Sequence, residues 1–267
     1  MFLDLKHMGH LRLGTLPTSK KWREVVALIP ESSASAPELA AATMEAAKGG
    51  IRRAANDAGF IKTFWLLTQI PLAARQQEFA TALRRLGLKV PPNPSAFDVL
   101  GAISESVENE IATERVRSDF AELALAAAQE SLSALCVEET RSLFGASPDD
   151  VQNSFRKYST SAQFRHLARR FFTGFTARYL KAFLSRELSN HVGDIEKFRS
   201  LHEHSEFNRA LDHHCFEAAK IVEEFAGGWF SKTNFESGID PENVRGFLYV
   251  SLKKIAEQLR REGLGNA

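Results

Sequence analysis

"FRHLARRFFTGFTARYLKAFLSREL", residues 164–188, is a helical segment whose apolar side does not stay in one place. At 100° per residue, its first half has one apolar face, formed by Phe164, Leu167, Phe171 and Phe175. The opposite face of this half is basic and is formed by Arg165, His166, Arg169 and Arg170. This half is therefore predicted to cover a core with one side and to expose arginines on the other.

Beyond Gly174 the apolar face shifts round the helix. Leu180 falls on the side that was polar, whereas Arg178 and Arg186 fall on the side that was apolar. A helix that is apolar on two sides in succession crosses a core or bends at its glycine. The two arginines are then partly buried and need acidic partners, because an unpaired buried charge is costly. The carboxylates of residues 105–139 are the obvious source.

The remaining chain is also predicted to be helical almost throughout. Ser35 has the spacing of a capping box with Glu38, and Ser147-Pro148 is typical of a helix start. Residues 95–144 are rich in Ala, Glu and Leu and are expected to form two helices. Later helices are predicted over roughly 148–158, 161–189, 206–226 and 240–262, with Gly227-Gly228 ending the third of them.

These segments predict an all-α fold, a multi-helix bundle. We expect two packed helical subdomains, residues 21–145 and 146–267, which meet near residue 146. Leucines alternate in residues 1–20 and predict a short extended or β-hairpin N-terminal arm. A two-stranded ribbon alone is marginal in water, so this arm is expected to contact the helices or another chain.

Charge is segregated along a chain whose formal net charge is only +1. Residues 96–150 hold twelve acidic residues and three arginines, whereas residues 151–190 hold eight basic residues and one glutamate. The basic helices that begin the second subdomain therefore have two interpretations. They pair with the acidic half of the first subdomain or with a protein, or they bind phosphates of a nucleic acid.

The composition is that of a soluble globular protein, with 44% hydrophobic and 25% charged residues. Two cysteines, Cys136 and Cys215, cannot form a disulfide framework, so a cytoplasmic location is expected. We find neither a secretory signal nor an apolar run that predicts a membrane span.

"DHHC", residues 212–215, is the stretch that most resembles a chemical site. Consecutive residues diverge on a helix, so these four side chains cannot converge on one ion. The preferred interpretation is a buried His214 beside a buried Cys215, with a His-Glu pair through Glu217 on the outer face. The alternative is a metal-dependent enzyme that uses the histidine-rich region 191–217, with His202, His204, His214 and Glu217 as ligands. We expect no cofactor, no structural metal and no catalytic residue.

An aromatic loop is predicted over residues 225–240, where the side chains fill a gap between helices or anchor a partner. Together with the basic face it gives a candidate interaction set: Arg165, Arg169, Arg170, Trp229, Phe230, Lys232 and Phe235. The nucleic-acid alternative uses the basic helix 156–186, through Arg156, Lys157, Arg165, Arg169 and Arg170.

No Walker loop, dinucleotide-binding fingerprint or metalloprotease motif is present in the sequence. We therefore expect a non-catalytic protein–protein interaction component of an intracellular multi-protein system, with a protein partner or a second copy of the chain. The alanine- and arginine-rich composition favours a bacterial source. Nucleic-acid binding and metal-dependent catalysis stay as alternatives.

Overall fold

The protein is all-α in the residues that the computed structural model describes, which are 19–31, 34–114, 118–140, 147–188 and 200–265. Eleven helices account for 84% of these residues, and no strand occurs among them. The first six helices are α1 (Lys20–Leu28), α2 (Ala36–Ala55), α3 (Ala58–Ala73), α4 (Phe79–Arg85), α5 (Ala96–Glu114) and α6 (Asp119–Thr140). The others are α7 (Pro148–Lys157), α8 (Ser161–Leu188), α9 (Leu201–Ala218), α10 (Lys220–Glu236) and α11 (Pro241–Gly265).

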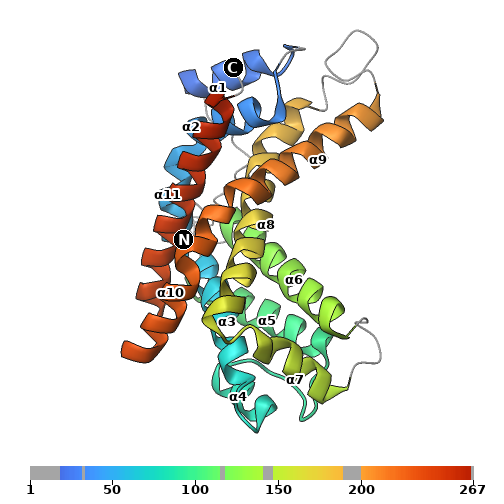
Figure 1. Cartoon of the computed structure of the whole chain (residues 1–267), viewed down its shortest axis with the longest axis vertical. Helices are drawn as coiled ribbons and strands as arrows, with labels where there is room; N and C mark the ends of the chain where they lie inside the picture. The colour runs from blue at the N-terminus through green and yellow to red at the C-terminus, as the bar shows by residue number, and fades with distance from the viewer. Residues whose placement is uncertain (1–18, 32–33, 115–117, 141–146, 189–199, 266–267) are drawn as a thin grey trace, which may run out of the picture.

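Helix α8 runs through the middle of the elongated bundle (Figure 1). It packs against α6 on one side and against α9 and α10 on another. Helices α2 and α11 lie side by side along one edge of the molecule, although nearly the whole chain separates them in sequence. Helices α4 and α7 lie at the end of the molecule away from α1.

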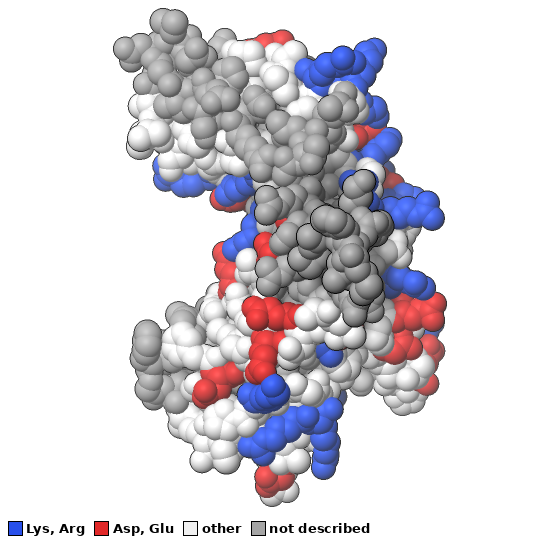
Figure 2. All heavy atoms as spheres, turned by 180° about the vertical axis from the view of Figure 1, so that it is seen from behind, with Lys and Arg blue, Asp and Glu red and all other residues white. Residues whose placement is uncertain are grey.

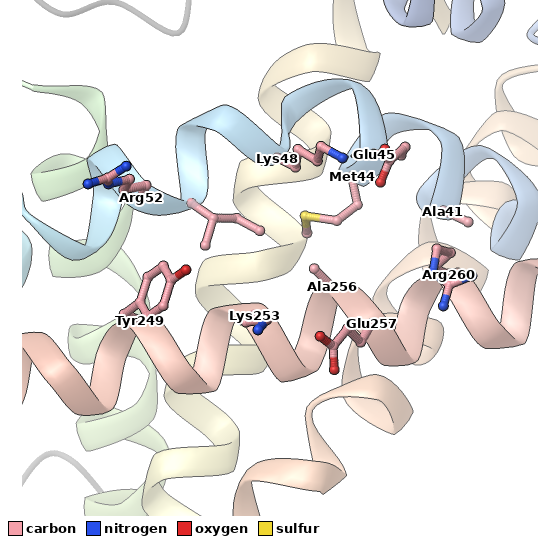
Figure 3. Close-up of a pocket in the computed structure, with 11 residues that line it drawn as sticks. Ala41, Met44, Glu45, Lys48, Arg52, Tyr249, Lys253, Ala256, Glu257 and Arg260 are labelled. Carbon is pink, nitrogen blue, oxygen red and sulfur yellow. Dashed lines mark hydrogen bonds and ion pairs between the residues drawn. The ribbon is translucent and has the colours of Figure 1, made fainter.

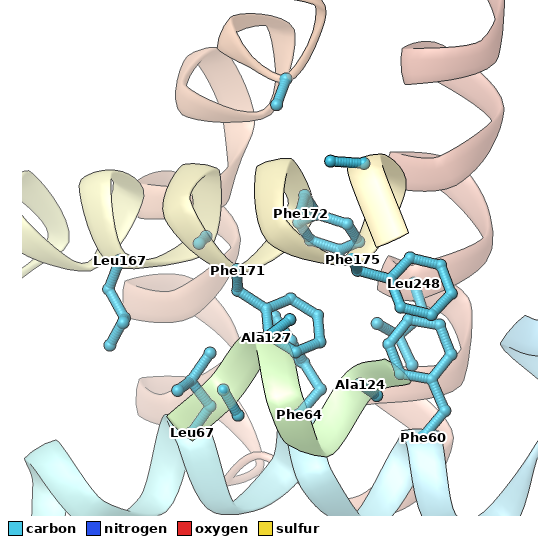
Figure 4. Close-up of a cluster of buried hydrophobic side chains, with 14 of the residues drawn as sticks. Phe60, Phe64, Leu67, Ala124, Ala127, Leu167, Phe171, Phe172, Phe175 and Leu248 are labelled. Atoms are coloured by element: carbon cyan, nitrogen blue, oxygen red, sulfur yellow. The ribbon is translucent and has the colours of Figure 1, made fainter. Parts of the chain in front are cut away.

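The core is densest where α8 meets α3 and α6 (Figure 4). Phe60 of α3 stacks on Phe175 of α8, with ring centroids 4.4 Å apart. Phe64 of α3 contacts the rings of Phe171 and Phe172, at 5.1 and 5.5 Å between centroids. Small residues of α6 face these rings, so α6 approaches α8 closely. Close-packed aromatic pairs of this kind contribute more than their buried area alone.

The two-sided character predicted for α8 is confirmed. Phe171 and Leu180, on different sides of the helix, are both fully buried. Arg178 is about one-third exposed, and its Nη2 lies 2.7 Å from a carboxylate oxygen of Glu130 in the acidic helix α6. The acidic half of the chain therefore supplies the partner that the partly buried arginine needs. The side chain of Arg186 lies outside the described residues.

Local signals placed most helix boundaries correctly. Ser35 and Glu38 form the predicted capping box, and Ser147 caps α7 in the same way through Asp150. Residues 95–144 do contain two helices, α5 and α6. These boundaries depend on hydrogen bonds between residues three positions apart, which a sequence shows directly.

The prediction of a loop over residues 225–240 is wrong. Helix α10 covers most of that range, and the preceding helix ends earlier than expected, at Ala218 rather than at residue 226. Gly227 does not end a helix. Its Cα faces the first turn of α8, and an added Cβ would lie 2.5 Å from the carbonyl oxygen of Ser161. The glycine permits a close crossing of two helices instead.

Two predictions lie outside the described residues: the N-terminal arm and the subdomain boundary near residue 146. Buried side chains from both halves of the chain belong to one continuous cluster that includes Trp22 and Leu259. None of the described helices is both long enough and apolar enough to span a membrane.

The adjacent glycines of α10 provide a matched pair for testing this crossing. Gly227→Ala should lower the free energy of unfolding by about 1–3 kcal/mol, because the methyl group meets backbone. Gly228→Ala should raise it by up to about 1 kcal/mol, because open space surrounds that position and alanine favours a helix. Urea denaturation followed by circular dichroism measures both. Equal effects of the two substitutions would contradict the close crossing.

Candidate binding groove

A groove of about 320 Å³ runs between α2 and α11 on the surface of the protein (Figure 3). From α2 it is lined by Ala41, Met44, Glu45, Lys48, Ile51 and Arg52. From α11 it is lined by Tyr249, Lys253, Ala256, Glu257 and Arg260. The two helices are antiparallel, so Arg52 and Tyr249 lie at one end and Ala41 and Arg260 at the other.

The floor of the groove is apolar. Met44 lies between the two helices in Figure 3 and is 4% exposed, and Ile51, which also lines the groove, is 9% exposed. Ala41 and Ala256 are half-buried, and their methyl groups leave room above the floor. Tyr249 is 44% exposed, which makes it one of the few large aromatic side chains in the described part of the chain that reaches solvent. The groove therefore has an aromatic residue at one end of an apolar floor.

Small residues close the other end of the groove. The Cα of Gly263 lies against α2, where an added Cβ would be 2.5 Å from Cβ of Ala41. On another side, α11 is held by α9, because His214 Nδ1 lies 3.0 Å from Glu262 Oε2. Helix α11 is thus fixed from two directions near its C-terminal end.

The rim of the groove is basic. Figure 2 shows Lys and Arg side chains along the edge of the molecule that α2 and α11 form in Figure 1. Glu45 contacts both Lys21 and Lys48, and these two hydrogen-bonded ammonium groups lower the pKa of its carboxyl.

Three further rim cations, Arg52, Lys253 and Arg260, form no ion pair with any described residue. Glu257 is the remaining rim carboxylate, so positive charge predominates once Glu45 is neutralised by its lysines.

Arg169 is not part of an exposed basic face, and that prediction is wrong. Its side chain is only 12% exposed because α9 ends directly over it. Nε and Nη2 donate to the carbonyl oxygen of Phe216, and the guanidinium lies 3.7 Å from the centre of the Phe216 ring. Glu217 and Glu223 each lie 3.3 Å from a guanidinium nitrogen. This arginine joins α8, α9 and α10.

The other predicted basic residues differ from Arg169 in exposure. Arg165 is exposed, and its Nε donates to His166 Nε2 at 3.4 Å. Arg170 is half-buried, whereas Arg156 and Lys157 are exposed at the end of α7. The nucleic-acid role of the exposed members stays a prediction.

The predicted aromatic residues of α10 separate into buried and exposed ones. Phe230 is 2% exposed and stacks on Phe164 at 4.0 Å, while Trp229 is half-buried and stacks on Phe247 at 4.0 Å. These two side chains fill the space between helices. Phe235 is 91% exposed, and Lys232 beside it is also exposed. An interaction role for these two residues stays a prediction.

The alternative metal ligands are not brought together. His214 faces Glu262 of α11, whereas Glu217 pairs with Arg169 of α8 rather than with a histidine. His202 lies at the exposed start of α9, near Glu206. His204 is half-buried one turn from Asn208. No group of three or more His, Cys, Asp or Glu side chains in the described residues has the geometry to hold a metal ion.

His214 and Cys215 are buried, as predicted. Burial raises the pKa of the Cys215 thiol to about 12 and that of Cys136 to about 11, so both thiols are poor nucleophiles at neutral pH. The Nε2 atom of His214 is buried and has no hydrogen-bond partner among the described residues. Burial lowers the pKa of His214, and the attraction of Glu262 opposes this shift only in part.

The groove residues were not identified from the sequence. Lys48 and Arg52 are four residues apart, and Lys253 and Arg260 are seven apart, so each pair lies on one helix face. That local signal was present. What the sequence did not show was that α2 and α11 are neighbours.

Comparison of the chain with protein-family models, with curated proteins and with solved structures gives no match. The groove is therefore interpreted from its own geometry and chemistry.

The buried histidine predicts a specific pH dependence. A group whose pKa is lowered by folding binds more protons in the unfolded state, so stability is lost as pH falls through the ordinary value of 6.5. One such group changes the free energy of unfolding by at most about 1.4 kcal/mol per pH unit. Denaturation between pH 7.5 and 5.5 should show this loss in the wild type and not in His214→Leu. His202→Leu, an exposed control on the same helix, should behave like the wild type. A His214→Leu curve parallel to the wild-type curve would contradict the assignment.

Proposed function

We propose that this chain is a non-catalytic helical component of a multi-protein assembly and that it binds a segment of a partner protein in the α2–α11 groove. The observation that supports this most directly is the apolar floor of the groove, open to solvent beside an exposed Tyr249 and beneath a rim on which Arg52, Lys253 and Arg260 have no ion pair with a described residue. Tyrosine and arginine are enriched at protein interfaces, where aromatic anchors supply much of the binding energy.

The size of the groove favours a segment of a protein over a whole globular face. Arg52 and Ala41 are eleven residues apart on α2, which corresponds to about 17 Å of helix. Standard interfaces between globular proteins bury about 800 Å² on each partner. A single groove of this length meets that requirement only as the central part of a larger contact, whereas it accommodates a short segment completely.

Site-specific photocrosslinking tests the proposal. A photoreactive phenylalanine analogue replaces Tyr249 in the groove or, as control, Phe97 on α5, which has a similar exposed fraction of 46%. In cells that make the protein, irradiation should give a discrete polypeptide adduct from position 249 and none of the same mass from position 97. Arg52→Glu combined with Lys253→Glu should remove most of that adduct.

Two results would contradict the proposal. The first is an adduct with nucleic acid at position 249, which would favour a nucleic-acid-binding protein. The second is the absence of any polypeptide adduct at position 249 while the variant is folded and abundant.

A further inference from the structure

The groove is long for its volume. A volume of about 320 Å³ spread over a length of about 17 Å describes a narrow channel. A narrow channel accepts a row of side chains more readily than one compact molecule. The occupant is therefore an elongated segment with apolar groups along one side.

The walls of the groove decide the backbone conformation of that segment. Both walls are helices, and the backbone N–H and C=O groups in the middle of a helix are already bonded to one another. An extended segment would find no backbone partners there, whereas a helix satisfies its own. The apolar side chains of a helix at positions i, i+4 and i+7 span about 10 Å along its axis, so this row of side chains fits along the length of the groove.

We infer that the α2–α11 groove binds an acidic amphipathic helix of about three turns from the partner protein, an inference that rests on the proposed function. The apolar row of this helix lies over Met44, Ala256 and Tyr249. Its carboxylates face Arg52 on one rim and Lys253 and Arg260 on the other. The three cations have no competing ion pairs among the described residues.

The two kinds of contact have different roles. Exposed ion pairs contribute little free energy each, so the apolar row and Tyr249 supply most of the affinity. Charges on both rims select acidic segments over basic ones and determine how affinity varies with salt.

The same chemistry disfavours a nucleic acid in this groove. A phosphate backbone requires continuous positive charge, whereas the rim includes Glu45 and Glu257 and the floor offers no hydrogen-bond donor. Tyr249 is the one aromatic residue among the described residues that line the groove, and a single-strand platform uses several in succession. A nucleic acid is accordingly the competing outcome of the experiment.

Designed peptides test the inference on the full-length protein by fluorescence anisotropy. The acidic peptide has about 16 residues, leucines at i, i+4 and i+7, and glutamates on both flanks. Two controls are a scrambled peptide, whose leucines share no face, and a peptide with lysines in place of the glutamates. The acidic peptide should bind at least tenfold more tightly than either control, and added salt should weaken it.

Variants locate the binding. Arg52→Glu with Lys253→Glu should weaken the acidic peptide about tenfold and should tighten the lysine peptide. Tyr249→Ala should weaken the acidic peptide without changing its salt dependence. The control is Arg75→Glu with Arg85→Glu, which removes the same charge from exposed positions around α4, far from the groove, and should leave binding unchanged. Circular dichroism checks that each variant is folded.

The outcomes separate the inference from the proposed function. Equal binding of the acidic and lysine peptides, or no binding of any peptide, overturns the inference that the groove binds an acidic helix. The proposed function still stands in that case if crosslinking at position 249 gives a polypeptide adduct. An oligonucleotide duplex that binds more tightly than the acidic peptide, and that depends on Arg52 and Lys253, overturns it as well. A loss of all polypeptide adducts at position 249 overturns the proposed function itself.

Discussion

The burial of α8 on several sides is the constraint on which the rest of this structure depends. A helix that presents phenylalanines to one side and leucines to another must be surrounded by other helices. Burying each large apolar side chain contributes about 1.5–3 kcal/mol, so every uncovered side would be costly. Helix α6 covers one side, where phenylalanines of α3 also reach the α8 rings, and α9 and α10 cover another. The charge of Arg178 costs little stability among these helices because Glu130 of the acidic helix α6 pairs with it.

The sequence predicted features that depend on near neighbours or on one helix. The caps at Ser35 and Ser147, the phase change after Gly174 and the burial of His214 belong to this group. Each follows from hydrogen bonds three residues apart or from the angle between side chains on one helix. The composition also predicted that an acidic residue of the 105–139 segment would pair with Arg178, although it did not identify Glu130 as that residue.

Features that depend on distant segments were not predictable in the same way. Two adjacent glycines favour a helix end, yet Gly227 serves a crossing with Ser161, more than sixty residues earlier in the chain. The pattern of α8 alone predicted that Arg169 lies on the surface, but α9 and α10 cover it in the structure. The groove needs both α2 and α11, and each helix alone is an ordinary amphipathic helix with a few surface cations. In each case contacts with a distant helix gave the residues a role that their local sequence pattern alone does not show.

The contact between Gly263 and Ala41 has a kinetic consequence. No side chain separates the two helices there, so no rotamer change can narrow or widen that end of the groove. If the groove binds the proposed segment, this end of it needs no rearrangement on association. Where binding needs no rearrangement, the encounter rate is set by diffusion and by attraction between opposite charges, while the lifetime of the complex reflects the contacts made afterwards. Salt would then act mainly on the association rate constant, and changes to the apolar floor mainly on the dissociation rate constant.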